Sequence, residues 1–213
     1  MSHADRILMG PGPGNPYPQV IKAFGRPVLG HLDPDFIALL DDTNERLREV
    51  FRTSNPLTFP VSATGSAGME ATIVNVLGPG DTVVIGVNGV FGERMCDVAT
   101  RCGATVVRVD AEWGRALDPQ DLLDAHPNPK VIAVVHAETS TGALTPIEEI
   151  SKIVHGAGAL LLLDAVTSLG GCPVRVDDWQ VDAIYSGTQK CLSCPPGLSP
   201  VSLSERAMDA IRG

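Results

Sequence analysis

A repeated alternation of short apolar runs and helix-like stretches constrains the fold of this chain more than any other feature. From about residue 58 onward, each apolar run is followed by a turn and then by a segment with helical spacing. Several runs, such as Leu160–Leu163, are apolar at every position, as strands covered on both faces must be. Strands that alternate with helices form right-handed βαβ crossovers. The sequence therefore predicts an α/β fold with a mostly parallel, doubly wound sheet.

The predicted strands cover 57–61, 82–87, 105–109, 131–136, 160–164, 183–186 and 200–203. The predicted helices between them cover 67–77, 92–102, 119–125 and 146–156. Two of these helices begin at Asp118-Pro119 and Thr145-Pro146, because a capping residue followed by proline is typical of a helix start. A further amphipathic helix is predicted over 33–52, with an apolar stripe along one side.

Residues 1–30 have a different character and are expected to form an extended arm ahead of one domain over 31–213. The Gly10-Pro11-Gly12-Pro13-Gly14-Asn15-Pro16 segment lacks the amide donors that a regular strand or helix would use. Its glycines do not follow a strand, which excludes a dinucleotide-binding fingerprint.

Charge and hydropathy limit the partners of this protein. A net charge of −9 provides no basic field for the phosphates of nucleic acid or of an anionic membrane. No apolar run approaches the roughly 20 residues of a membrane helix, and the first residues lack a signal-peptide core. We therefore expect a soluble, cytoplasmic protein, or an organellar one in a compartmentalised cell.

The cysteines favour neither a disulfide framework nor a metal site. There are five, an odd and dispersed set, which fits reduced thiols. Cys191 and Cys194 have the spacing of a redox or zinc motif, but no second pair completes four ligands. No metal site is predicted.

Lys190 and Asp164 each follow an apolar strand-like run. A desolvated lysine amine is a nucleophile that traps carbonyl groups as Schiff bases, and a carboxylate can pair with a protonated pyridine nitrogen. The alternatives are a surface or ion-paired lysine and a capping or turn aspartate. Because ligands gather at the strand ends of open α/β sheets, the pair together suggests pyridoxal phosphate.

Other segments at predicted strand ends fit the same cofactor. The turn Thr64-Gly65-Ser66 opens a helix, and helix amides with hydroxyls can seat a phosphate; it can also be a plain N-cap turn. Phe91, flanked by glycines, can stack on a planar ring or belong to the core. Polar groups also converge over His136–Gly142, where His136 itself is assigned no acid–base role.

Together these segments resemble the class V group of fold-type I pyridoxal-phosphate enzymes, most closely the alanine–glyoxylate and serine–glyoxylate aminotransferases. The resemblance runs from about residue 7 to the last residue and keeps the family's order and spacing. Its segments are 10–13, 30–34, 64–66, 88–92, 136–142, 164–171 and 186–197. The lysine segment, with its Pro195-Pro196-Gly197, is the most specific of them.

The resemblance implies a role for each matching residue. Lys190 would form the Schiff base and move the substrate proton, and Asp164 would pair with the pyridine nitrogen. Phe91 would stack on the ring where relatives often have tryptophan. Thr139 would contact the phenolic oxygen side, Thr64, Gly65, Ser66 and Gln189 would hold the phosphate, and Gly12 and Pro13 would line the substrate site. Ser66 stands where close relatives often have histidine.

The implied function is transamination of alanine or serine with glyoxylate or pyruvate, by a homodimer. Relatives continue past the lysine with the rest of the large domain and a small C-terminal domain, which supplies the arginine that holds the substrate carboxylate. Residues 31–213 are thus expected to form an incomplete large domain without the small one. The alternatives are another class V activity, such as aspartate or phosphoserine transamination or a lyase reaction, and a non-catalytic cofactor-binding or oligomerisation fragment.

Overall fold

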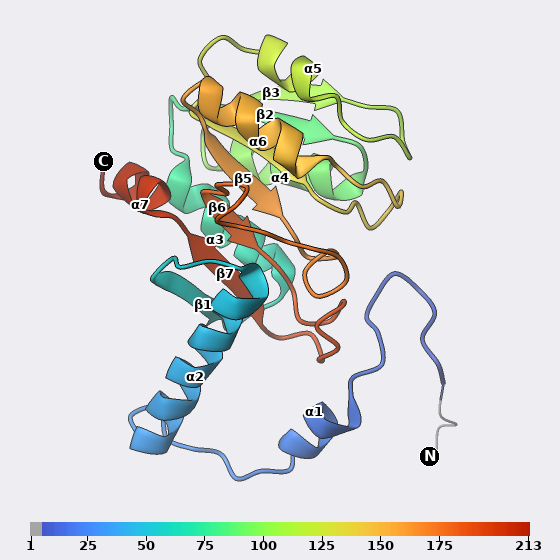
Figure 1. The fold of residues 1–213 in the computed structure, drawn as a ribbon, viewed down its shortest axis with the longest axis vertical. Helices are drawn as coiled ribbons and strands as arrows, with labels where there is room; N and C mark the ends of the chain where they lie inside the picture. The colour runs from blue at the N-terminus through green and yellow to red at the C-terminus, as the bar shows by residue number, and fades with distance from the viewer. Residues whose placement is uncertain (1–5) are drawn as a thin grey trace.

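A seven-stranded sheet forms the centre of the protein, in a computed structural model that describes residues 6–213 (Figure 1). The strands are β1 (Leu57–Val61), β2 (Thr82–Val87), β3 (Thr105–Asp110), β4 (Val131–Val135), β5 (Leu160–Asp164), β6 (Ala183–Tyr185) and β7 (Ser199–Leu203). Their order in the sheet is β1-β7-β6-β5-β4-β2-β3. All neighbours from β3 to β6 pair in parallel, which confirms the predicted fold class. β7 is antiparallel to β6, because no crossover helix separates the two strands, and it is also antiparallel to β1.

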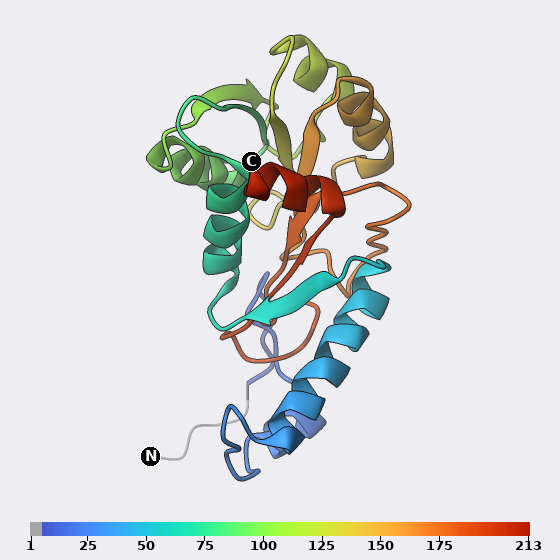
Figure 2. The ribbon, with the colours of Figure 1, turned by 90° about the vertical axis from the view of Figure 1, so that its left-hand side faces the viewer.

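Helices cover both faces of the sheet, as Figures 1 and 2 show. They are α1 (Pro18–Ala23), α2 (Pro34–Phe51), α3 (Gly65–Val76), α4 (Val90–Arg101), α5 (Pro119–Asp124), α6 (Ile147–Gly156) and α7 (Glu205–Arg212). Residues of α3, α4 and α7 pack into one apolar core, and residues of α5 and α6 into the other. The strands between the two cores are therefore buried on both sides, as their uninterrupted apolar sequences predicted.

Two helices were not predicted from the sequence. α1 has only six residues within the segment expected to be an extended arm, which is too short for a periodic apolar pattern. α7 begins after Ser204, whose side chain accepts a hydrogen bond from the Ala207 amide and caps the helix. The capping serine was the available signal for α7.

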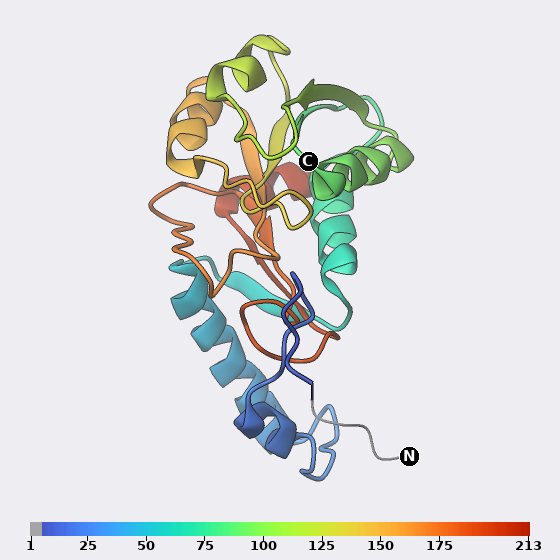
Figure 3. The same cartoon turned by 90° about the vertical axis from the view of Figure 1, so that its right-hand side faces the viewer.

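The arm and α2 lie to one side of the sheet, where the arm runs along the loop between β6 and β7 (Figure 3). Two backbone hydrogen bonds hold it there, from Gly14 to the Gln189 carbonyl at 3.0 Å and from Tyr17 to the Ser193 carbonyl at 3.2 Å. The predicted α2 is present, but most of its apolar stripe is uncovered in this chain. Phe51 is its only buried residue.

No helix within residues 6–213 has the length and apolar character needed to cross a lipid bilayer. Over the same residues, no three or more His, Cys, Asp or Glu side chains come together as a metal site.

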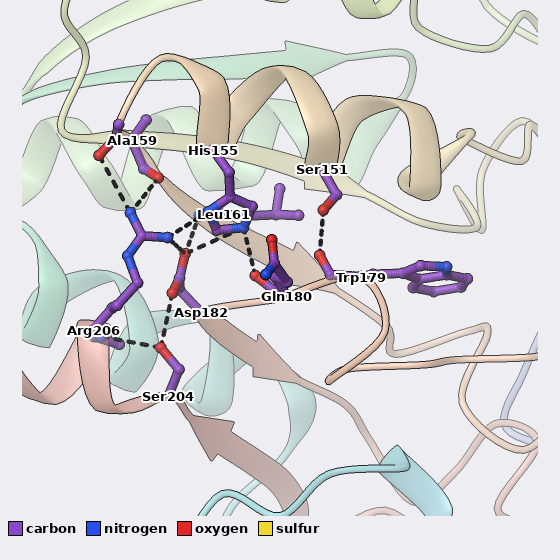
Figure 4. Close-up of polar contacts among 11 residues, drawn as sticks. Ser151, His155, Ala159, Leu161, Trp179, Gln180, Asp182, Ser204 and Arg206 are labelled. Atoms are coloured by element: carbon purple, nitrogen blue, oxygen red, sulfur yellow. Dashed lines mark hydrogen bonds and ion pairs between the residues drawn. The ribbon is translucent and has the colours of Figure 1, made fainter.

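A buried carboxylate secures the amino end of β6 (Figure 4). Asp182 is 1% exposed and accepts hydrogen bonds from the Leu161 amide at 2.9 Å, the Ser204 hydroxyl at 2.8 Å and the Arg206 guanidinium at 3.0 Å. Arg206 also donates to the Ala159 carbonyl at 3.0 Å. This network fastens α7 to the strands at the end of the sheet that lies away from Asp164 and Lys190.

Replacing Asp182 by alanine should lower the free energy of unfolding by about 2 to 3 kcal/mol, because buried donors lose their acceptor. The measurement is urea unfolding followed by circular dichroism. The matched control is Asp209→Ala on α7, whose carboxylate forms an exposed pair with Arg212 and should matter by less than about 0.5 kcal/mol. Equal losses in the two variants would contradict a structural role for the network.

Candidate active site

A cavity of about 230 Å³ lies where the carboxyl ends of β5 and β6 meet the first turns of α3 and α4. Its lining contains seven of the eight predicted cofactor residues: Thr64, Gly65, Ser66, Phe91, Asp164, Gln189 and Lys190. It also contains Met69, Arg94, Val166 and Tyr185. A larger hollow of about 640 Å³ beside the end of α2 has only exposed or half-buried side chains in its lining. The smaller cavity is the better candidate site, because it brings buried ionisable groups together.

Asp164 is the last residue of β5 and is 2% exposed. Its Oδ1 atom accepts a hydrogen bond from the Val166 amide at 2.8 Å, and its Oδ2 atom accepts one from the Tyr185 hydroxyl at 2.7 Å. Burial raises the pKa of Asp164 to about 6, while these two hydrogen bonds act in the opposite direction. A buried carboxylate at the wall of a cavity favours a positively charged partner inside it.

Lys190 lies in the loop after β6 and is half-buried. Its Nζ atom donates a hydrogen bond to the Pro11 carbonyl at 2.6 Å. Burial lowers its pKa, which increases the fraction of the neutral, nucleophilic amine. The arm can approach this closely because Gly12 has no side chain: a Cβ atom there would lie 2.3 Å from the Lys190 Cδ atom. Gly12 also has a φ of +114°, a conformation that favours glycine.

The first turn of α3 provides a seat for an anion. The helix begins at Gly65, two residues earlier than predicted, with Thr64 as its N-cap. The amides of Gly65 and Ser66 therefore occupy the first positions, which have no acceptor inside a helix. The Ser66 hydroxyl accepts a hydrogen bond from Arg94 at 2.8 Å, so a guanidinium adds positive charge beside these amides.

Phe91 lies in the first turn of α4 rather than in the loop that the sequence predicted. α4 starts at Val90 because groups from the loop after β4 cap it. The Phe91 amide donates to Glu138 at 3.2 Å, and the Val90 amide donates to the Ser140 hydroxyl at 3.0 Å. Glu138 is 1% exposed and also accepts from the Ser140 amide and hydroxyl. This capping fixes the Phe91 ring at the cavity wall.

The remaining predicted residues lie outside the lining of the cavity. The hydroxyl of Thr139 forms a short hydrogen bond with that of Thr167. Gly12 contacts Lys190, and Pro13 is the next residue of the same arm. His136 is buried against Trp179 with ring centroids 5.3 Å apart, and burial lowers its pKa to about 4.

Tyr185, Arg94 and Glu138 were not predicted as site residues. No local sequence pattern marks Tyr185, whose place in the site follows from strand register, since it pairs directly with Asp164 across the β5–β6 ladder. Arg94 lies one helical turn after Phe91, which places both side chains on the same side of α4. Glu138 is the carboxylate of the 136–142 segment, which the sequence singled out for its converging polar groups without giving Glu138 a role.

The chain belongs to the aminotransferase class-V family, whose family model matches residues 18–212. It is 41% identical over 208 residues to (S)-ureidoglycine–glyoxylate transaminase of Bacillus subtilis (strain 168), and the matched region covers 97% of this chain and 50% of that protein. It is 40% identical over 211 residues to alanine–glyoxylate aminotransferase of Drosophila melanogaster, and the matched region covers 97% of this chain and 53% of that protein. A crystal structure of alanine–glyoxylate aminotransferase from Nostoc sp. superposes with a TM-score of 0.96 at 47% identity, over 100% of this chain and 57% of that one.

These comparisons confirm the predicted family and the match to the large domain of fold-type I aminotransferases. The family depends on pyridoxal phosphate. The chain spans about half the length of the curated relatives that it matches.

Asp164→Asn should change how stability depends on pH in the cofactor-free protein. Burial raises the pKa of Asp164 from 3.8 to about 6. Its contribution to stability is therefore complete below pH 3.8 and is lost as the pH rises through about 6. The variant lacks this loss. The free energy of unfolding of the variant, minus that of the parent, should therefore increase by on the order of 2 kcal/mol as the pH rises from 4.5 to 7.5.

Urea unfolding of both proteins across this range measures the difference. The variant must be compared with the parent at each pH, because His136 also makes stability depend on pH, in the opposite direction to Asp164 and equally in both proteins. Its pKa is lowered from 6.5 to about 4, so its contribution is lost as the pH falls. A difference between the two proteins that does not vary with pH would contradict the burial of an ionisable Asp164.

Proposed function

We propose that this protein binds pyridoxal 5′-phosphate in the cavity and transfers an amino group from a small amino acid, alanine or serine, to glyoxylate or pyruvate. The observation that carries the proposal is the convergence on one cavity of the Lys190 amine, the Asp164 carboxylate and the amino end of α3. The names of the relatives support glyoxylate as the acceptor. Membership of a pyridoxal-phosphate-dependent family supports the cofactor.

The groups in the cavity fit this cofactor chemically. The amides at the start of α3 suit a phosphate dianion, and Arg94 adds charge there. The half-buried ring of Phe91 offers an apolar wall for stacking. The buried Asp164 suits a protonated ring nitrogen. When bound, the cofactor supplies an aldehyde that condenses with an amine and a ring that accepts an electron pair.

Two side chains would do the chemical work. Lys190 would hold the cofactor and then, once a substrate amine has displaced it, take the proton from the substrate Cα atom as a general base. Its lowered pKa suits both tasks, because both require the neutral amine. Asp164 would remain ionised and keep the ring nitrogen protonated. Gly12 and Pro13, on the arm against Lys190, would border the place of the substrate.

Borohydride reduction in the presence of pyridoxal phosphate should attach the cofactor to Lys190, and peptide mass spectrometry should find the adduct there. Lys190→Ala should lose the adduct and the absorbance of the bound cofactor. The matched control is Lys152→Ala, which removes an exposed lysine paired with Glu148 on α6 and should leave the labelling unchanged. Labelling of another lysine, or none in the parent, would contradict the assignment.

Alanine with glyoxylate is the direct assay of the transfer, with pyruvate formation as the readout. Turnover that disappears in Lys190→Ala supports the proposed reaction. Binding of the cofactor without turnover by the 213-residue chain would instead favour a unit that only binds the cofactor.

We also propose a homodimer, supported by the apolar side chains of the arm and α2. Val28 is 97% exposed, Leu32 76% and Phe24 72%. Large apolar side chains gathered on one exposed segment mark an interaction surface.

The double variant Val28→Asp, Leu32→Asp should therefore sediment as a monomer in analytical ultracentrifugation, where the parent sediments as a dimer. The control is Trp113→Asp, which charges an exposed aromatic residue in the loop between β3 and α5 and should remain dimeric. A monomeric parent would contradict the homodimer.

A further inference from the structure

Tyr185 is a fully buried polar side chain beside the candidate site, and the proposed reaction gives it no role. It is 0% exposed, lines the cavity and lies opposite Asp164 in the β5–β6 ladder. Its hydroxyl donates to the Asp164 Oδ2 atom at 2.7 Å. Burying a phenol hydroxyl is costly unless it has a hydrogen-bond partner, so this contact accounts for a tyrosine at a core position.

The chain packs closely around the fully buried Tyr185 side chain. α3 crosses close to it at Gly68, where an added Cβ atom would lie 3.3 Å from the Tyr185 Cβ atom and 1.9 Å from the Ser199 hydroxyl. The other oxygen of Asp164 is held by the Val166 amide at 2.8 Å. Both oxygens of the carboxylate are thus fixed by groups of the folded chain, and the carboxylate cannot rotate freely.

The charged groups near this pair act in different directions. Glu138, from the loop after β4, raises the pKa of Asp164, and Lys190, from the loop after β6, lowers it. Arg94, on α4, lowers the pKa of Tyr185, but burial and Asp164 raise that pKa well above its usual value. The phenol therefore stays protonated and remains a donor, which stabilises the ionised form of Asp164.

We infer that Tyr185 is a positioning residue that keeps Asp164 ionised and oriented, so that a proton shared with the ring nitrogen of the bound cofactor stays on the ring. This inference rests on the proposed function. A proton shared between the ring nitrogen and the carboxylate lies nearer to the more basic of the two. A hydrogen bond donated to one oxygen of a carboxylate makes the whole group less basic. A protonated ring is the stronger electron acceptor, so the phenol would strengthen the cofactor without touching it.

Tyr185→Phe removes the hydroxyl and keeps the ring. In the cofactor-free protein, the pKa of Asp164 should rise by about one unit, measured by NMR titration of ¹³C-labelled aspartate carboxyl groups. In the loaded protein, the ¹⁵N chemical shift of ring-labelled pyridoxal phosphate should move toward that of the unprotonated ring. The matched control is Tyr17→Phe, because Tyr17 is 63% exposed on the arm; it should change neither value.

A second variant covers the case in which Tyr185→Phe does not fold. The chain has two tyrosines, so growth of the Tyr17→Phe variant on 3-fluorotyrosine labels position 185 alone. Fluorine makes the phenol a stronger donor, so the pKa of Asp164 should fall, opposite to the effect of phenylalanine. A purely structural tyrosine would not reverse the sign.

The two titrations separate this inference from the proposed function. If the parent binds no pyridoxal phosphate, the proposed function fails, and the cofactor-free titration still tests the hydrogen bond. If the parent binds the cofactor but fluorination and phenylalanine both leave the Asp164 pKa and the ring ¹⁵N shift unchanged, the role of Tyr185 is overturned.

Discussion

The candidate site depends on one buried carboxylate at the carboxyl end of the central strand β5. Asp164 has almost no contact with solvent, and the chain supplies it with two hydrogen-bond donors and no directly bonded cation among the described residues. Such an arrangement is unfavourable in isolation, because burial opposes ionisation. It becomes favourable when a cation occupies the cavity. The rest of the cavity, from the amino end of α3 to the Lys190 amine, suits a molecule with that cation, an anion and a carbonyl group.

The two ends of the sheet differ in structure: one is closed by a side-chain network, and the other borders the cavity. At the amino ends of the strands, Asp182 and Arg206 close the structure with side-chain hydrogen bonds. At the carboxyl ends, the chain turns into α3, α4 and the lysine loop, and side chains from these elements line a cavity. This division follows from parallel strands, whose carboxyl ends meet at one edge of the sheet.

Much of the fold and the ionisable part of the site could be predicted from the sequence. All seven strands were found close to their true bounds. The clearest were the buried parallel strands β4 and β5, whose sequences are apolar almost throughout. Lys190 and Asp164 were recognisable because each follows such a run. Tyr185 was not, because its role depends on the register between two strands, which no local pattern encodes. The start of α4 was missed for a similar reason, since Glu138 caps it from a distant loop.

The most direct test of this account is a crystal structure of the protein grown with pyridoxal phosphate. We expect continuous electron density from the Lys190 Nζ atom to the cofactor, with the ring nitrogen within hydrogen-bond distance of Asp164 and the phosphate at the first turn of α3. The Lys190 amine must then leave the Pro11 carbonyl. A cofactor bound elsewhere, or one whose ring nitrogen faces away from Asp164, would contradict the account.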